Sequence, residues 1–285
     1  MKIGFAGLGV MGGPMARHLV AAGHEVAGYN RSPDKARAWA QANGGRFAAT
    51  VAEAAEDADL FILCVGNDDD VRQVVTEALP HLKAGAIVVD HTTTSAKIAR
   101  EMSEASGAKG VAFIDAPVSG GQAGAENGLL SVMAGGDAAA LETARPLVMA
   151  YSKAIQHMGP SGSGQLTKMV NQIAIAGVVQ GLAEAVHFAQ KAGLDTDAVY
   201  DAISKGAAQS WQMDNRWKTA AKGEFEFGFA VDWMRKDLGL VLDEARTNGA
   251  RLSLTALVDQ FYAEVQAMGG ARWDTSSLAA RLQDR

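Results

Sequence analysis

Three glycines near the start of the chain have the spacing of a loop that binds a diphosphate. The stretch Gly7-Leu8-Gly9-Val10-Met11-Gly12 directly follows an apolar run at residues 3–6 and precedes a helical pattern at residues 14–22. In such a loop the first glycine permits a tight turn, the second lets a phosphate approach the backbone, and the third lets helix and strand pack closely. The helix N-terminus then offers free N–H groups to the phosphates. This context predicts a dinucleotide-binding loop; the alternative is a glycine turn with a structural role only.

The residues that follow the second expected strand, at residues 25–29, bear on which dinucleotide binds. An acidic side chain at this place would accept hydrogen bonds from the 2′-hydroxyl of NAD. The chain has Asn30-Arg31-Ser32 instead. A neutral amide does not repel a 2′-phosphate, and a guanidinium can bind that phosphate through two hydrogen bonds. We therefore expect NADP(H) in preference to NAD(H), with NAD as the weaker cofactor; the alternative is that Arg31 is an ordinary solvated residue at the start of a helix.

A lysine and an asparagine one helical turn apart follow a second glycine-rich segment, residues 159–164. Hydride transfer to a carbonyl leaves an alkoxide that needs a proton, and the reverse reaction needs a base. Lys168, if desolvated where two domains meet, could have a pKa lowered towards neutrality and fill both roles. Asn171 lies on the same helix face and could orient the substrate or the ammonium group. A single lysine on a helix is more often a solvated surface residue, so this reading needs support from elsewhere in the chain.

The elements that must position these residues change in character along the chain. Over residues 1–160, short strand-like runs alternate with helix-like runs, which predicts an α/β fold of the Rossmann type with a doubly wound, mostly parallel sheet. From residue 165 onward nearly everything has helical periodicity, beginning with a long apolar helix at residues 165–192 that we expect to be buried nearly all round. We therefore expect an NADP-binding domain at residues 1–162, an all-helical substrate and dimerisation domain at residues 163–285, and a substrate held in the cleft between them.

Composition restricts the partners. A net charge of −6 and a pI near 5.5 argue against a nucleic acid or an anionic membrane surface, but not against a small anionic substrate. The apolar stretch at residues 173–189 contains Gln180, Glu184 and His187, which favours a buried helix over a membrane span. The low polarity of the same helix predicts a homodimer or homotetramer. The first strand begins at residue 3, and the single cysteine, Cys64, reads as an inert core thiol, so we expect a cytoplasmic protein.

Four motifs occur in one order along the chain. They are the glycine loop at residues 7–12, D-A-P-V-S-G-G at residues 115–121, G-S-G-Q-L-T-K-M-V-N at residues 162–171, and K-D-L at residues 236–238. In order and spacing they resemble the β-hydroxyacid dehydrogenase family, which includes 3-hydroxyisobutyrate dehydrogenases, tartronate semialdehyde reductases and glyoxylate/succinic semialdehyde reductases. The resemblance implies hydride transfer between NADP(H) and a small β-hydroxy acid or its semialdehyde.

The resemblance also implies roles for individual residues. The implied substrate residues are Ser119, Gly120 and Gly121 for the carboxylate, Lys168 as the proton relay, and Asn171. The implied cofactor residues beyond the glycine loop and Asn30-Arg31-Ser32 are Val65, Thr92, Thr93 and Lys236. Simpler readings remain open for several of these positions. Residues 119–121 could be a plain turn, Thr94 or Ser95 could cap the following helix, and Asp237 could either hold Lys236 or be a solvated helix residue.

Some features point away from the family or to no chemistry. The acidic run Asp68-Asp69-Asp70 departs from the family pattern, so the resemblance does not fix the cofactor contacts of Val65 and Asn67. We interpret the run as helix-start carboxylates rather than a metal site. The histidines lack ligand spacing, so no metal is expected. Trp211 and Trp233 could line a substrate pocket, although buried packing is the default. Two rival functions are a catalytically silent nucleotide-binding module and an imine reductase. Intact Lys168 and Asn171 argue against the silent module. Lys168 also argues against the imine reductase, since imine-reducing relatives typically lack this lysine.

Overall fold

The computed structural model describes residues 1–283 of the chain and divides them into two compact units. The first unit is Met1–Lys168, and the second begins at Met169. The division falls inside the long helix α8 (Ser163–Lys191), between Lys168 and Met169, whereas the sequence predicts a boundary between residues 162 and 163. Each unit has a hydrophobic core of its own.

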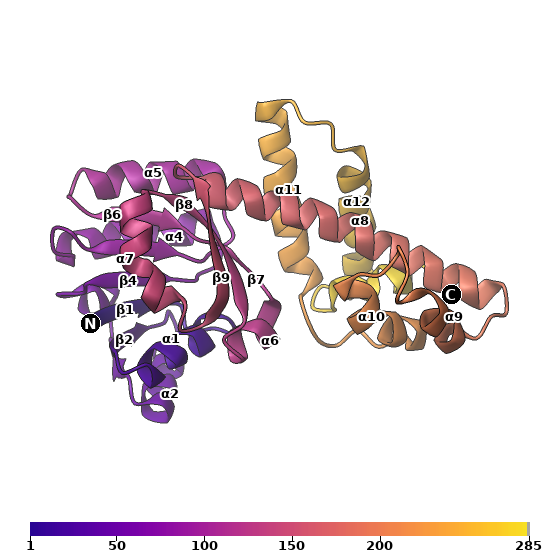
Figure 1. Cartoon of the computed structure of the whole chain (residues 1–285), viewed down its shortest axis with the longest axis horizontal. Coiled ribbons are helices and arrows are strands. Elements are labelled where there is room, and N and C mark those ends of the chain that lie inside the picture. The colour runs from indigo at the N-terminus through magenta and orange to yellow at the C-terminus, as the bar shows by residue number, and fades with distance from the viewer. Residues whose placement is uncertain (284–285) are drawn as a thin grey trace. The chain divides into compact units, whose positions relative to one another are not determined.

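The first unit is built on a sheet that has nine strands within the described residues (Figure 1). The strands are β1 (Lys2–Ala6), β2 (Glu25–Tyr29), β3 (Arg46–Phe47), β4 (Leu60–Leu63), β5 (Ile87–Asp90), β6 (Ala112–Asp115), β7 (Val118–Ser119), β8 (Leu130–Gly136) and β9 (Ser152–Gly159). They lie in the order β3-β2-β1-β4-β5-β6-β8-β7, and β9 pairs with β8. The strands from β3 to β6 are all parallel, whereas β8 is antiparallel to β6 and β7. The predicted doubly wound, mostly parallel sheet is confirmed.

Helices cover both faces of this sheet. They are α1 (Gly12–Ala21), α2 (Pro33–Asn43), α3 (Val51–Ala55), α4 (Asp68–Ala78), the 3-10 helix η1 (Leu79–His81), α5 (Ala96–Gly107), α6 (Gly121–Glu126) and α7 (Ala138–Val148). Along β4, Leu60 and Ile62 join one core with α1, α2 and α7, while Phe61 and Leu63 join the other with α3, α4 and α5. A strand that is apolar at every position is therefore buried on both faces, as parallel sheets require.

Two elements of the first unit were not expected from sequence. Strand β7 is only two residues long and pairs with β8 through Val118–Val132 and Ser119–Ser131, and the short helix α6 follows it at once. Gly120 between them has φ +133°, a value that side-chain-bearing residues rarely adopt. A segment this short and this rich in glycine carries too few apolar residues for a recognisable period.

The second unit is helical except for an isolated bridge between Ala230 and Asp274 within the described residues. After α8 its elements are α9 (Thr196–Ile203), α10 (Trp211–Lys222), α11 (Val231–Asn248), α12 (Ser253–Ala267) and the 3-10 helix η2 (Thr275–Leu282). Their core combines Val179 of α8, Leu238 of α11 and Tyr262 of α12, among other buried residues. The predicted all-helical character of this part of the chain is confirmed.

The long helix, which we expect to be buried nearly all round by its own chain and a partner subunit, has an uncovered face within the single described chain. Val170, Val178 and Phe188 of α8 are 65%, 39% and 71% exposed, so one face of the helix lies outside the core. By length and composition α8 could cross a membrane, and 39% of its most apolar window is buried inside the protein. The opposite side of the helix carries the core residues and two buried glutamines, Gln172 and Gln180. Alanine and valine occupy both faces of this helix, so the sequence does not distinguish its buried face from its exposed face.

Candidate active site

Two of the three glycines of the first motif, Gly7 and Gly12, have no room for a side chain. Gly7 has φ +97°, and a Cβ there would lie 2.1 Å from the carbonyl oxygen of Cys64. A Cβ on Gly12 would lie 1.9 Å from the carbonyl oxygen of Gly7, which shows how closely the start of α1 packs on the loop. No atom lies within 4 Å of the place where Gly9 would carry its Cβ. The backbone is therefore open at Gly9, and the loop fits the diphosphate of a nicotinamide dinucleotide.

The end of β2 is joined to this loop by a contact that the sequence did not reveal. The Oδ1 of Asn30 accepts a hydrogen bond from the backbone N of Leu8 at 3.1 Å, and its Nδ2 donates to the Ser32 carbonyl at 3.3 Å. Arg31 is different, since its side chain is 87% exposed and its Nη1 lies 3.4 Å from Oδ1 of Asp70. Asn30 thus braces the glycine loop, while Arg31 stands at the surface with only an exposed ion pair.

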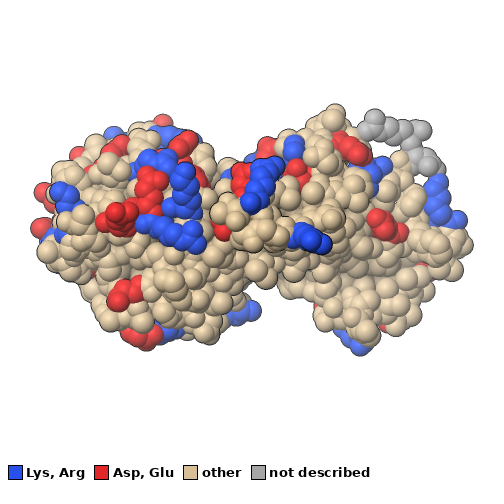
Figure 2. All heavy atoms as spheres, turned by 90° about the horizontal axis from the view of Figure 1, so that it is seen from above, with Lys and Arg blue, Asp and Glu red and all other residues tan. Residues whose placement is uncertain are grey.

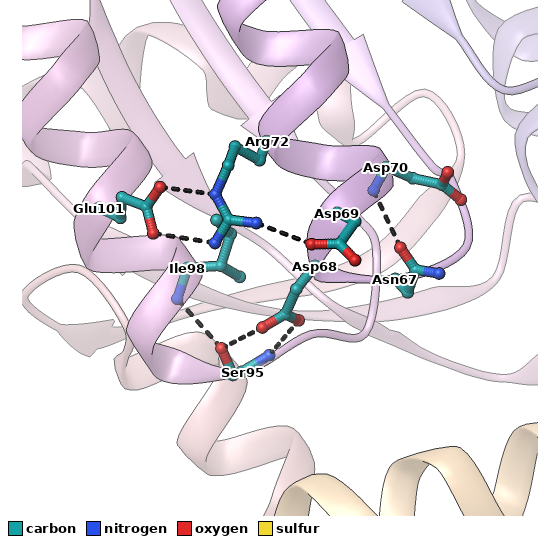
Figure 3. Close-up of polar contacts among 8 residues, drawn as sticks. All are labelled: Asn67, Asp68, Asp69, Asp70, Arg72, Ser95, Ile98 and Glu101. Carbon is teal, nitrogen blue, oxygen red and sulfur yellow. Dashed lines mark hydrogen bonds and ion pairs between the residues drawn. The ribbon is translucent and has the colours of Figure 1, made fainter.

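The acidic run forms the start of α4 and connects neighbouring segments (Figure 3). Asp68 accepts from the backbone N of Ser95 at 3.0 Å and from its Oγ at 2.5 Å, which ties α4 to the start of α5. Ser95 in turn caps α5 by accepting from the N of Ile98 at 3.0 Å, so Ser95 rather than Thr94 is the cap. Asp70 accepts from the N of Gly66 at 3.1 Å. The interpretation as helix-start carboxylates is confirmed, and the described residues contain no cluster suited to a metal ion.

Asp69, the middle carboxylate of residues 68–70, pairs with an arginine of its own helix. Asp69 pairs with Nη1 of Arg72 at 2.8 Å, and Arg72 also binds Glu101 through two hydrogen bonds of 2.7 and 3.0 Å (Figure 3). On the face drawn in Figure 2, acidic and basic side chains lie beside one another in the same way, among larger uncharged areas. Asp69 is 91% exposed, so it serves as a reference for a carboxylate at this helix start with no contact to Arg31.

The ends of β4 and β5 are held together below the surface. The backbone N of Val65 donates to Oγ1 of Thr92 at 3.0 Å, and the N of Thr92 donates to Oδ1 of Asp90 at 2.9 Å. Asp90 and Thr92 are both buried. Burial raises the pKa of the Asp90 carboxyl to about 7 despite its hydrogen bonds to Thr92. Two predicted cofactor residues, Val65 and Thr92, are therefore in direct contact with each other.

A buried histidine behind this edge has a purely internal set of partners. The Nδ1 of His91 lies 2.6 Å from the Ala116 carbonyl, and its Nε2 lies 2.8 Å from the hydroxyl of Tyr151. A carbonyl can only accept, so Nδ1 carries the proton and Nε2 accepts from Tyr151. Burial lowers the pKa of His91 to about 4, which keeps the ring neutral. His91 therefore links the ends of β5 and β6 to the segment before β9.

The end of β6 fixes the glycine-rich segment before α8. The two carboxylate oxygens of Asp115 accept from the backbone N of Gly162 at 2.7 Å and of Gln165 at 3.0 Å. Burial raises the pKa of Asp115, although these hydrogen bonds favour its charged form. The side chain of Gln165 adds a second link, donating to the Thr92 carbonyl at 2.7 Å and accepting from the N of Thr94 at 3.0 Å. These bonds set where α8 starts and hence where Lys168 lies.

Lys168 is buried, with 8% exposure, and lies beside the predicted carboxylate segment. Its Nζ donates to the Val118 carbonyl at 2.9 Å. Val118 immediately precedes Ser119, Gly120 and Gly121, and a Cβ on Gly121 would meet no atom within 4 Å. The structure thus brings the predicted proton relay and the predicted carboxylate-binding segment together in one unit.

In the second unit, the other predicted residues belong to one row of hydrogen bonds. Asn171 donates from Nδ2 to Oε1 of Gln172 at 2.8 Å, and Gln172 donates from Nε2 to Oδ2 of Asp237 at 2.7 Å. The Nζ of Lys236 lies 3.3 Å from Oδ1 of Asp237. Asp237 is 2% exposed, so it holds Lys236 and is not a solvated helix residue. Sequence reasoning missed Gln172, which directly follows a motif residue and has no chemical signature of its own.

The default of buried packing for the two tryptophans is wrong. Trp211 is 58% exposed and Trp233 is 43% exposed. The guanidinium of Arg216 lies 5.0 Å from the centre of a Trp211 ring, and the Nζ of Lys236 lies 5.9 Å from that of Trp233. Both indoles therefore stack with cations at the surface of the second unit.

Comparison with known families matches both parts of the chain. Residues 2–159 match the NAD binding domain of 6-phosphogluconate dehydrogenase, and residues 162–282 match the NAD-binding family of NADP-dependent 3-hydroxyisobutyrate dehydrogenase. An uncharacterized oxidoreductase of Shewanella frigidimarina is 61% identical over 285 residues, which is 99% of this chain and 98% of that protein. A probable 3-hydroxyisobutyrate dehydrogenase of Mycobacterium bovis is 34% identical, over 99% of this chain and 98% of that protein.

Solved structures agree with these matches. The 3-hydroxyisobutyrate dehydrogenase of Mycobacterium tuberculosis, solved with L-serine, has a TM-score of 0.91 and 33% identity and covers 99% of both chains. Psf3, solved in complex with NADP⁺ and 2-OPP, has a TM-score of 0.88 and 26% identity over 99% of this chain and 100% of that chain. With the glycine loop and the buried lysine in place, the chain belongs to the β-hydroxyacid dehydrogenase family of NAD(P)-dependent oxidoreductases, which includes the 3-hydroxyisobutyrate dehydrogenases.

Proposed function

We propose that this enzyme transfers a hydride between NADP(H) and a small β-hydroxy acid or its semialdehyde, with Lys168 relaying the proton. The observation that carries the proposal is the hydrogen bond from Lys168 to the Val118 carbonyl, next to Ser119, Gly120 and Gly121. This bond places the buried side chain of Lys168 beside the backbone of residues 119–121, which has room for a carboxylate at Gly121. A small β-hydroxy acid fits this arrangement, because its carboxylate can bind residues 119–121 while its hydroxyl reaches Lys168.

In the proposed reaction, the residues of the chain bind, orient and exchange one proton. The bound nicotinamide supplies or accepts the hydride. Residues 119–121 hold the substrate carboxylate through the Ser119 hydroxyl and the backbone N–H groups of the glycines. Lys168 gives its ammonium proton to the carbonyl oxygen as negative charge develops there, and takes the proton back from the hydroxyl in the oxidative direction. We assign the orientation of the substrate hydroxyl to Asn171.

The preference for NADP(H) rests on two side chains at the end of β2. Asn30 is uncharged, and Arg31 is exposed enough to turn towards a 2′-phosphate. The NADP⁺ bound to Psf3 and the NADP-dependent family matched by residues 162–282 support this preference. We assign the diphosphate to residues 7–12 and further cofactor contacts to Val65, Thr92, Thr93 and Lys236.

Replacement of Lys168 tests the proposed relay. Lys168→Ala should lower kcat by about 10²–10⁴, the usual share of one positioned acid–base group. Lys168→Arg should not restore turnover, because a guanidinium does not give up its proton near neutral pH. The Kd of NADPH, measured by fluorescence, should barely change in either variant, since the cofactor is held elsewhere. Near-wild-type turnover in Lys168→Ala would exclude the relay, and loss of NADPH binding with an intact fold would make Lys168 a nucleotide-binding residue instead.

We also propose that the enzyme is a cytoplasmic homodimer or homotetramer. The exposed apolar residues of α8, Val170, Val178 and Phe188, support a partner on this face of the helix. Light scattering at micromolar concentration should give a multiple of the 29.7 kDa chain mass. A value equal to one chain would contradict the assembly, without bearing on the reaction.

A further inference from the structure

The row of hydrogen bonds from Asp237 to Asn171 has a fixed direction. Amide side chains can be turned end for end, and each end can donate or accept. An ionised carboxylate only accepts, and Asp237 holds the end of this row beside Lys236 at 3.3 Å. Gln172 must therefore point its Nε2 at Asp237, where the distance is 2.7 Å. Its Oε1 then faces Asn171 and can only accept, so Asn171 must donate from its Nδ2, at 2.8 Å.

This direction decides which atom Asn171 offers to anything else. Gln172 accepts from one of the two N–H groups of the Asn171 amide, which turns Nδ2 towards Gln172 and leaves Oδ1 on the opposite side of the amide. An amide oxygen accepts a hydrogen bond from a hydroxyl or an ammonium group, whereas an amide nitrogen would present a donor to a substrate oxygen. Gln172 is 2% exposed and Asp237 is 2% exposed, so water does not compete for the bond between these two side chains.

We propose that Gln172 is a positioning residue for the reaction, which locks Asn171 with Oδ1 presented as an acceptor for the substrate hydroxyl. The inference rests on the proposed function, in which Asn171 orients the substrate hydroxyl, and it specifies that Oδ1 of Asn171 accepts from that hydroxyl. Gln172 touches neither substrate nor cofactor in this account. It transmits the orientation set by Asp237, so its loss leaves Asn171 able to rotate about its terminal bond.

The first test replaces Gln172 with methionine, which has similar length and no hydrogen-bonding amide. Gln180→Met is the matched control, because Gln180 is a buried glutamine of the same helix, 4% exposed, that donates to Glu184 at 2.6 Å. Gln172→Met should lower kcat about 10- to 100-fold with the Kd of NADPH unchanged, as expected when a reacting group is misplaced. Gln180→Met should retain kcat within about twofold. Unchanged kcat in Gln172→Met, or loss of NADPH binding and thermal stability beyond that of the control, would overturn the inference.

The second test uses Gln172→Glu, whose protonated form reproduces both bonds of the glutamine. A carboxylic acid can donate O–H to Asp237 and accept from Asn171 with its carbonyl oxygen. The charged groups that α11 presents there are Asp237 and Lys236, and the Asp237 carboxylate opposes a second negative charge. A glutamate side chain accepts from Asn171 in either protonation state, so Gln172→Glu should keep a kcat well above that of Gln172→Met from about pH 6 to about pH 9. A kcat as low as that of Gln172→Met in folded enzyme would contradict the proposed direction.

An NMR measurement without substrate separates this inference from the proposed function. The Nδ2 protons of Asn171 should show a hydrogen-bonded shift that Gln172→Met abolishes and Gln180→Met preserves. If no compound is turned over by the wild type, the proposed function fails, yet this signal still decides the orientation of Asn171. If the signal is absent from the wild type, the locked orientation is wrong whatever the enzyme's substrate.

Discussion

The two halves of the carboxyl edge of the sheet differ in how far water reaches them. At the ends of β2 and β4, Arg31 has an 87% exposed side chain and its partner Asp70 a 26% exposed one. At the ends of β5 and β6, Asp90 and Asp115 are fully buried and Lys168 is 8% exposed. The buried half is arranged by hydrogen bonds before any ligand arrives, whereas the exposed half can rearrange around one.

In the proposed function, this difference separates two tasks within one nucleotide-binding fold. A proton relay must be held in place, because misplacing a reacting group by about 1 Å costs much of the rate. Choosing between NADP and NAD needs only one favourable or unfavourable charge at the ribose, and surface side chains suffice for that. Substitutions should therefore cost most on the buried half and least on the exposed half.

The largest effect is expected at Asp115, which holds the start of α8. Asp115→Ala removes the acceptor of the backbone N–H groups of Gly162 and Gln165, at 2.7 and 3.0 Å. Leaving these groups unbonded should lower the free energy of unfolding by about 2–5 kcal/mol, measured by urea denaturation. Asp69→Ala on the exposed half is the reference and should stay within about 0.5 kcal/mol. Equal losses in both variants would remove the distinction between the two halves.

Asn30→Asp should alter cofactor choice while the glycine loop keeps its shape. An aspartate at this place can still accept from the N of Leu8, as Asn30 does at 3.1 Å. Its negative charge would oppose a 2′-phosphate at a cost of about 1–3 kcal/mol, or roughly one to two decades in the Kd of NADPH. The Kd of NADH should stay level or fall. Wild-type protein that binds both cofactors equally, or a ratio that does not move, would count against the NADP preference.

Asp90 should make stability fall with rising pH. Its pKa is about 7 in the folded chain against 3.8 as the ordinary value, so the folded state retains a proton that the unfolded chain has lost between these pH values. Asp90→Asn removes this cost and should gain about 1–2 kcal/mol over wild type as the pH rises from 5 to 7. His91 acts in the opposite sense, since its pKa of about 4 costs stability as the pH falls below 6.5. Both proteins share His91, so a constant difference between them would show that Asp90 titrates normally.

The smallest effect is expected at Asp70 of the exposed half. Its carboxylate would compete with the 2′-phosphate of NADPH for Arg31, but exposed ion pairs are weak. Asp70→Asn should tighten NADPH binding by about two- to fivefold and leave NADH unchanged. Asp69→Asn carries the same change of charge without contact to Arg31 and should not shift the ratio. A shift of equal size in both variants would indicate a general charge effect.

Local patterns predicted the fold and most of the site. Alternating apolar runs and the spacing of three glycines predicted the sheet, and the motif around Lys168 singled out the buried lysine for which we propose the relay. What escaped prediction depends on contacts between distant residues, such as Asn30 with Leu8, His91 with Tyr151, and Gln172 with Asp237. A hydrogen bond across 22, 60 or 65 positions leaves no period in the sequence. The exposure of one face of α8 was not predicted for another reason: apolar residues occur on both sides of this helix, so the sequence pattern does not separate them.

The most direct test of the proposed reaction is a substrate panel followed by the absorbance of the reduced nicotinamide. The panel contains 3-hydroxyisobutyrate, 3-hydroxypropionate, serine, glycerate, small semialdehydes and a cyclic imine, each with NADP(H) and with NAD(H). We predict turnover of at least one β-hydroxy acid or semialdehyde, faster with NADP(H), and none of the imine. Turnover confined to the imine, or no turnover of any compound by folded enzyme saturated with cofactor, would contradict the account.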